Sequence, residues 1–320
     1  NQKETRSQRN PPRTAETPEK EKTESEVKPM SDYDEIIESK SKPKENHFPK
    51  KDWKAEKNNL FEIANSAAVD TVYSGKNLRK YLETQSRFDK YSATNVLLIM
   101  SQKPEATQIK DYNSWQKAGV TVKKFEKSFS ILKPGKEYKT ESGEIRQNFN
   151  IKKMFDISQT TAEPEEKPEI HFDDKLLLKA LIHKSPVPIQ MADHLEFNRG
   201  AFYDNEKETL FVLRGMSAPD IFRSVSKELA FAELAKTRSD YRRSECEFPA
   251  YCASLILCQK NGIDTKDYDF SRIPESIRSK EPAQIRAQLG EIRETAINIM
   301  ERMNKVLIPE KVPKTKEQER

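Results

Sequence analysis

The stretch YSATNVLLIMSQKPEATQIKDYNSWQKAGVTVKKFEKSFSILKP, residues 91–134, decides the fold class because its hydrophobic period changes once along its length. Ser92 can cap a helix that runs through consecutive apolar residues and ends before Pro104. A second short helix fits DYNSWQKAG and stops at Gly119. From Val120 onward, apolar and polar residues alternate, which is typical of a half-buried strand. The stretch therefore predicts an α+β fold, with helices followed by a sheet.

The flanking sequence extends this arrangement on both sides. Before the stretch, apolar residues recur at helical spacing in two segments of residues 53–88. After it, NFNIKKMFDISQT at residues 148–160 alternates with period two, and Gly135 and the ESGE of residues 141–144 are predicted turns. Residues 51–160 are thus predicted to form a domain of N-terminal helices with a small antiparallel sheet.

A second domain is predicted beyond a Pro- and Glu-rich linker, TAEPEEKPE, at residues 161–169. Residues 170–308 show a helical pattern, then a hairpin pattern in GAFYDNEKETLFVLRG, and then three more helical patterns. These residues are predicted to form an α+β domain. The charged residues 309–320 are predicted to form a loose tail.

The composition indicates that part of the chain does not fold by itself. Only 34% of the 320 residues are hydrophobic and 34% are charged, and residues 1–50 combine Lys, Glu, Ser, Thr and Pro with few aromatic residues. Such a segment cannot offset its ordering entropy by burial, so a disordered N-terminal tail is expected. No apolar run approaches the roughly 18 residues of a membrane span, so no membrane partner is expected. Three cysteines without a CxxC pair favour a reducing compartment, and the predicted location is cytoplasmic.

The helical segment SVSKELAFAELAK, residues 224–236, has the spacing of the HExxH zinc-protease motif without its ligands. In that motif two histidines four residues apart share one helix face and bind the metal, and the glutamate activates the metal-bound water. Here Lys227 and Phe231 occupy the histidine positions and cannot bind zinc, while Glu228 remains at the position of the base. An ordinary amphipathic helix with a solvated glutamate is the alternative interpretation.

The segment from Lys103 to Lys153 is basic and interleaved with aromatic residues. It has twelve Lys and Arg against six acidic residues, and this surplus of six exceeds the net charge of +5 for the whole chain. Basic side chains that follow a phosphate backbone, with rings for bases to stack on, suit a single-strand binder. A soluble basic sheet whose rings pack in the core is the alternative. Trp115 and Phe125 fit either interpretation.

The first domain resembles the ArdC/LtrC group of proteins, which occurs on plasmids and conjugative elements. The motifs YSATNVLLI, WQKAGVTVKKFEKS and FDISQT carry the resemblance to the single-stranded-DNA-binding domain of that group. The group's KGEKG reads KFEKS here, so Phe125 and Ser128 replace two glycines, which would permit a tight turn. The resemblance implies DNA binding by Tyr91, Asn95, Trp115, Lys117, Lys123, Lys124, Phe125, Lys127, Lys152 and Lys153.

The second domain resembles the metallopeptidase-like domain of the same group, in which a hairpin precedes HELAHA and a later helix carries a third ligand. On this pattern Tyr251 replaces the third ligand, so Lys227, Phe231 and Tyr251 are degenerate metal positions and Glu228 is a remnant. The resemblance implies a zincin-like domain without metal, and no cofactor is expected. An ion pair between Lys227 and Glu228 is expected, with Phe231 and Tyr251 filling the vacated volume.

The purified chain is predicted to contain no stoichiometric zinc, because all three ligand positions have changed together. The remaining histidines and cysteines form no local set with the spacing of metal ligands. Elemental analysis measures the metal content, and about one zinc per chain at this site would contradict the prediction.

The favoured function is that of a non-enzymatic protein of a plasmid or conjugative element whose partner is single-stranded DNA. One alternative is an active zinc metallopeptidase, against which the missing ligands argue. Another is an anti-restriction or protein-interaction factor whose partners are proteins of the host or of the element.

Overall fold

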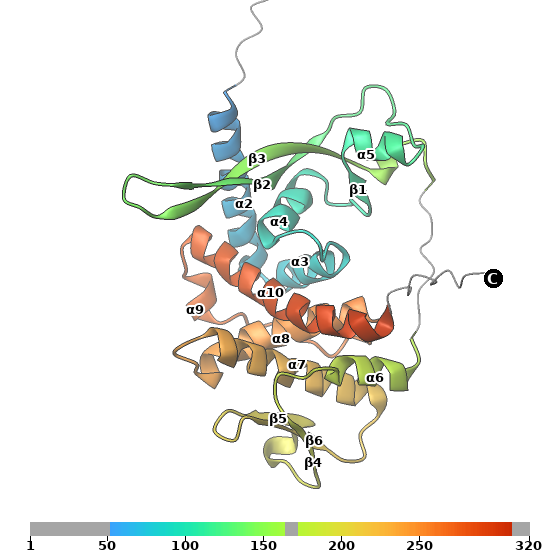
Figure 1. Ribbon diagram of the computed structural model, residues 1–320, viewed down its shortest axis with the longest axis vertical. Coiled ribbons are helices and arrows are strands. Elements are labelled where there is room, and N and C mark those ends of the chain that lie inside the picture. Colours follow the sequence, from blue (N-terminus) through green and yellow to red (C-terminus); the bar gives the residue numbers. More distant parts are fainter. Residues whose placement is uncertain (1–51, 164–171, 309–320) are drawn as a thin grey trace, which may run out of the picture. The chain divides into compact units, whose positions relative to one another are not determined.

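The computed structural model describes residues 52–163 and 172–308, which belong to one compact unit, Asp52–Arg320 (Figure 1). Helices and small sheets make up the described residues, so the predicted α+β fold class is confirmed. The predicted tails, residues 1–50 and 309–320, and most of the predicted linker lie outside the described residues. The division into two domains stays a prediction.

Four helices open the described chain, and each begins at a side chain that accepts a hydrogen bond from the first turn. Ser92, the predicted cap, accepts from the backbone N–H of Asn95 at 3.3 Å. The apolar faces of the first three helices pack in the core, as their helical spacing predicts. The helices are α2 (Trp53–Tyr73), α3 (Gly75–Arg87), α4 (Ala93–Gln102) and α5 (Tyr112–Lys117).

The first sheet of the described chain is antiparallel and has the strand order β1-β3-β2. Its strands are β1 (Ile109–Lys110), β2 (Phe129–Lys139) and β3 (Ile145–Asp156). The β2–β3 hairpin turns at residues 140–144, as predicted, and projects beyond the helices in Figure 1. The predicted turn at Gly135 is wrong, because β2 continues through it with a bulge nearby.

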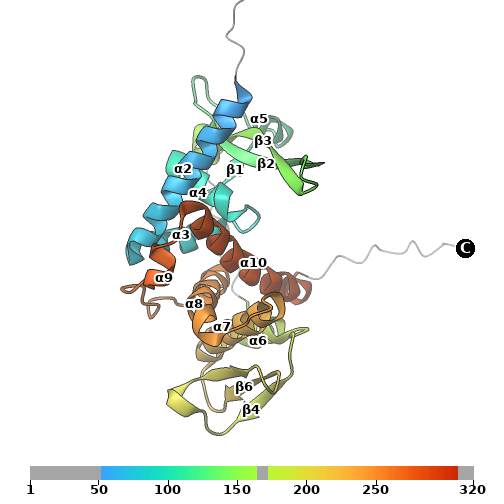
Figure 2. The same ribbon diagram turned by 90° about the vertical axis from the view of Figure 1, so that its left-hand side faces the viewer.

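The described chain from residue 172 onward packs helices against a second small sheet (Figure 2). The predicted hairpin is confirmed as β5 and β6, whereas β4 was not predicted and pairs with β6 in parallel, which gives the order β4-β6-β5. The elements are α6 (Asp174–Ile182), β4 (Ile189–Ala192), β5 (Ala201–Asp204), β6 (Thr209–Leu213), α7 (Ala218–Thr237), α8 (Arg243–Lys260), α9 (Glu275–Arg278) and α10 (Pro282–Leu307). None of the described helices is long and apolar enough to span a bilayer.

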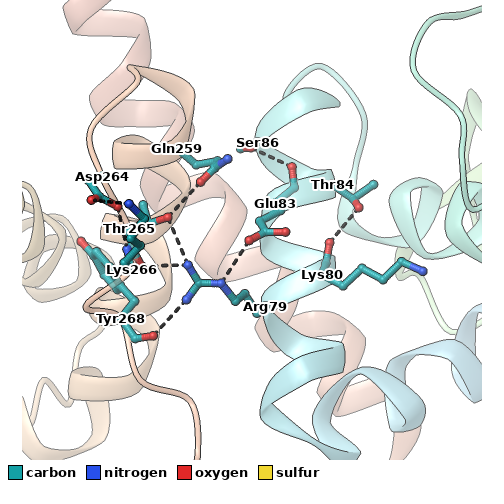
Figure 3. Close-up of polar contacts among 10 residues, drawn as sticks. All are labelled: Arg79, Lys80, Glu83, Thr84, Ser86, Gln259, Asp264, Thr265, Lys266 and Tyr268. Carbon is teal, nitrogen blue, oxygen red and sulfur yellow. Dashed lines mark hydrogen bonds and ion pairs between the residues drawn. The ribbon is translucent and has the colours of Figure 1, made fainter.

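Polar contacts join α3 to the loop that follows α8 (Figure 3). Arg79 donates to the carbonyl oxygens of Tyr268 at 3.0 Å and Thr265 at 2.8 Å. At the start of α3, a Cβ atom on Gly75 would meet the carbonyl oxygen of Phe270 at 2.1 Å, so this approach requires glycine. Further along the chain, α10 contacts α2 and α4, which brings the last helix alongside the N-terminal helices (Figure 2).

Candidate nucleic-acid interface

A groove of about 630 Å³ lies among α2, the turn before α4, strands β2 and β3, and α10. Its volume falls within the roughly 300–1,000 Å³ of typical ligand sites. Among the described residues that line it, five are basic, three are aromatic and none is acidic. The basic residues are Lys90, Lys133, Lys152, Arg286 and Arg293, and the aromatic residues are Phe61, Tyr91 and Phe149. The groove therefore presents positive charge and aromatic rings together.

Arg286 of α10 is held in the groove by contacts with the N-terminal helices. Its Nε donates to Asn65 Oδ1 at 2.7 Å and its Nη1 to Thr94 Oγ1 at 3.3 Å. Its guanidinium lies 5.4 Å from the centroid of the Phe61 ring. Burial lowers the pKa of Arg286 from its ordinary value, but a guanidinium keeps its proton at neutral pH. The site thus holds a partly desolvated cation, whose attraction for an anion is stronger than in water.

Arg293, two helical turns further along α10, has a donor without a partner. Its Nη2 donates to the carbonyl oxygen of Asp89 at 2.8 Å, and its Nη1 pairs with Glu294. Its Nε is buried and makes no hydrogen bond within the described residues. Lys90 and Lys133 at the groove are exposed.

Three of the predicted DNA-binding residues line this groove: Tyr91, Asn95 and Lys152. Lys152 Nζ lies 2.6 Å from Asp111 Oδ2, and this contact holds the pKa of Asp111 below its usual range. The charge of Lys152 is therefore largely neutralised in the free protein. Asn95 is buried and exchanges hydrogen bonds of 2.8 and 2.9 Å with the backbone of Leu132, so its role is to fix β2 against α4.

Trp115 and Lys153 are committed to contacts elsewhere in the fold. Trp115 is 2% exposed, its Nε1 donates to the carbonyl oxygen of Phe155 at 3.0 Å, and the ammonium of Lys110 lies 4.5 Å from its ring. This burial contradicts the DNA-binding role that the resemblance implies for Trp115 and favours the alternative, because the ring packs in the core and is not open to a base. Lys153 forms an ion pair of 2.7 Å with Glu56.

The other predicted DNA-binding residues lie outside the groove, at the end of α5 and on the loop between α5 and β2. All of them are exposed, and Lys123 also donates its Nζ to the carbonyl oxygen of Ser158 at 3.1 Å. These residues are close to one another in the sequence, and none of them lines the groove. They are Lys117, Lys123, Lys124, Phe125 and Lys127.

The two arginines of α10 are not among the DNA-binding residues that the sequence predicts. Arg286 and Arg293 lie in an amphipathic segment, AQIRAQLGEIRETAINIMERM, that contains no aromatic residue and has equal numbers of basic and acidic residues. Nothing local distinguishes them from the solvated charges of an ordinary helix. Their contacts with Asn65 and Asp89 join segments that are far apart in sequence, and only the fold brings these segments together.

The KELAF motif lies on α7, where Glu228 forms a buried ion pair with Arg243 at the start of α8. Glu228 is 1% exposed, and its carboxylate oxygens lie 2.8 and 2.9 Å from Arg243 Nη2. One of them also accepts from the backbone N–H of Tyr203 in β5 at 2.7 Å. The guanidinium lies 3.8 Å from the centroid of the buried Phe231 ring. The carboxylate thus joins α7, α8 and β5.

The expected ion pair between Lys227 and Glu228 is wrong, because Lys227 instead lies 3.4 Å from Glu247. Tyr251 packs its ring against two other aromatic rings, and its hydroxyl accepts from a backbone N–H of the loop after α8. These positions do not fit a divalent metal ion, since Phe231 has no lone pair, Lys227 is charged and a guanidinium engages Glu228. Across residues 52–163 and 172–308, no group of three His, Cys, Asp or Glu could hold a metal.

Together these features define an α+β protein with a basic and aromatic groove beside its N-terminal helices and first sheet. Residues 33–172 match the family model for the N-terminal domain of anti-restriction factor ArdC. The match confirms the resemblance to the ArdC group for this part of the chain.

Similar proteins are found among curated sequences and among solved structures. An uncharacterized protein of Bacillus anthracis, pXO2-81, is 25% identical over 301 aligned residues, which cover 76% of this chain and 51% of the relative. The chain therefore spans about half the length of that relative. The metal-free structure of the antirestriction ArdC protein from plasmid R388 is 18% identical, with a TM-score of 0.48 and coverage of 67% of this chain and 86% of that chain. For the Mn(II)-bound structure these values are 15%, 0.46, 69% and 86%.

Proposed function

We propose that this chain binds single-stranded DNA in the groove between α2, the β2–β3 sheet and α10. The observation that carries the proposal is the lining, in which five basic and three aromatic residues meet and no described lining residue is acidic. Lys152 and Arg293 are paired with Asp111 and Glu294 beside the groove, so Lys90, Lys133 and Arg286 are the basic residues on which the proposal mainly depends. Basic side chains neutralise phosphates, and aromatic rings stack on bases. The match to the ArdC N-terminal domain adds a role in anti-restriction, on a plasmid or conjugative element, to the proposal.

The position of the aromatic rings favours a single strand over a duplex. Phe61, Tyr91 and Phe149 are half-buried in the walls of the groove, so a base must leave its stack to contact them. A duplex keeps the faces of its bases stacked on one another and presents only their edges in its grooves. The phosphates of a flexible single strand can meanwhile follow the basic residues of the same groove.

Fluorescence anisotropy with one oligonucleotide in single-stranded and duplex form tests this function. The single strand is expected to bind on the order of tenfold more tightly, since only its bases can stack on the rings. Its log affinity is expected to fall with log salt concentration with a slope of about −2 to −3, because each phosphate contact contributes roughly −0.7. Equal affinity for both forms, or an affinity that does not change with salt, would contradict the proposal.

The chain from α6 to α10 is proposed to be without peptidase activity and to act as a structural part of the DNA-binding protein. Lys227, Phe231 and Tyr251 supply no ligand set, and the Glu228 carboxylate is engaged by Arg243. A carboxylate held in this way is not placed to accept a proton from a reacting water. The chain from α6 to α10 contributes to binding through α10, which supplies two of the five basic residues of the groove.

A further inference from the structure

The turn at residues 123–126 presents an exposed aromatic ring on a backbone conformation that suits glycine. The backbone N–H of Glu126 lies 3.5 Å from the carbonyl oxygen of Lys123, across a four-residue turn. Phe125 is the third residue of the turn and has a φ of +68°. That is the position at which a type II turn takes glycine or asparagine. The Phe125 side chain is 99% exposed.

The turn is fastened to the segment at residues 158–160 on both of its sides. Before Phe125, Lys123 donates its backbone N–H to the carbonyl oxygen of Gln159 at 2.9 Å. After it, Gln159 Nε2 donates to Glu126 Oε2 at 3.0 Å and to the carbonyl oxygen of Lys127 at 2.9 Å. The side chain of Gln159 is itself fixed by its bond to the backbone N–H of Asp156. The turn therefore cannot relax without losing these hydrogen bonds.

Two features of Phe125 are unfavourable in the free protein. A positive φ brings the Cβ atom of an L-residue close to the carbonyl group of the preceding residue, and a bulky side chain is rare there. An exposed ring also contributes no hydrophobic stabilisation, because its apolar surface stays in contact with water. By contrast, Phe129, four residues later at the start of β2, is buried in the core. Strained positions that the surroundings enforce cluster at binding sites.

We infer that Phe125 is a stacking residue for an unpaired base, at a second contact point outside the groove. This inference rests on the proposed single-strand binding and deepens it. Lys123, Lys124 and Lys127 are exposed and lie within two residues of Phe125 in the sequence, and the one acidic residue of the turn, Glu126, already accepts from Gln159. A single ring among cations suits a base beside its phosphates, whereas a membrane anchor needs a larger apolar surface.

The variant Phe125→Gly separates a binding role from a structural one. It is expected to bind a single-stranded oligothymidylate about tenfold more weakly, the loss of one base–aromatic stack. Its thermal midpoint is expected to rise by about 1–4 °C, because glycine accepts the positive φ. Phe125→Trp is expected to keep the wild-type affinity, and its emission is expected to be quenched by the oligonucleotide. The wild type gives the baseline for Trp53 and Trp115.

Phe197→Gly is the matched control, because Phe197 also combines a positive φ, +59°, with an exposed ring. It lies between β4 and β5, and its ring is 5.1 Å from the guanidinium of Arg199. This variant is expected to bind the oligonucleotide as the wild type does. Wild-type affinity in Phe125→Gly, an equal loss in both glycine variants, or unquenched emission in Phe125→Trp would overturn the inference alone. A wild-type chain that binds no single strand would overturn the proposed function as well.

Discussion

Replacing Arg243 by alanine is expected to lower the free energy of unfolding by about 3–5 kcal/mol, because it leaves the buried carboxylate of Glu228 without its cation. The change also removes the hydrogen bond of 3.2 Å to the carbonyl oxygen of Tyr203 and the contact of the guanidinium with the Phe231 ring. One backbone N–H remains to Glu228, which does not compensate a full buried charge. Denaturant titration followed by circular dichroism measures the loss.

Lys227→Ala is the control for this prediction, since it removes the cation of a neighbouring ion pair that is open to solvent, at the residue before Glu228 on α7. The Lys227–Glu247 pair has side chains that are 31% and 55% exposed, so its loss is expected to cost less than about 1 kcal/mol. Arg243→Lys is expected to lie between the two, because lysine keeps the charge but lacks the planar fork. Equal losses in Arg243→Ala and Lys227→Ala would contradict the account of this ion pair.

The spacing of apolar residues in the sequence predicted those helices and strands that bury one face. The four N-terminal helices and the β5–β6 hairpin follow from apolar spacing, because spacing reports which residues face a core. The strand predicted from Val120 onward is wrong for residues 120–128, which form an irregular loop with one isolated bridge from Val122 to Thr160, and β2 begins only at Phe129. β4 (Ile189–Ala192) escaped prediction because it is short, partly exposed and stabilised by its parallel pairing with a strand about twenty residues later. A pattern within one segment does not report its pairing partner.

The candidate site was less predictable for the same reason. A basic segment with aromatic residues indicated a nucleic-acid binder, but its composition did not show that Trp115 packs in the core while Phe125 is exposed. The KELAF spacing directed attention to Lys227 as the partner of Glu228, whereas the burial of that carboxylate against α8 selects Arg243. Arg286 reaches the groove only because α10 packs on α2 and α4, which no local signal reports.

Arg286→Glu is expected to weaken single-strand binding by about 10- to 100-fold, because a charge-assisted contact with phosphate is lost and a like charge faces the strand. The loss is expected to be large because Arg286 is partly desolvated and already held by Asn65 and Thr94, so little entropy is lost when it contacts a phosphate. For Arg286→Gln, the decrease in log affinity is expected to be about half of that for Arg286→Glu, since glutamine removes the cation without adding an anion. Anisotropy titration at one fixed salt concentration measures these affinities.

Binding of the single strand is proposed to depend on the groove rather than on the net charge of the chain. The most direct test is the affinity of Arg286→Glu beside that of Arg278→Glu, which makes the same charge change on the exposed helix α9 outside the groove. Both variants are first shown to keep the wild-type circular dichroism and thermal midpoint. The affinity is expected to fall by about 10- to 100-fold in Arg286→Glu and by less than about threefold in Arg278→Glu. Equal losses, or wild-type affinity in Arg286→Glu, would contradict the proposal.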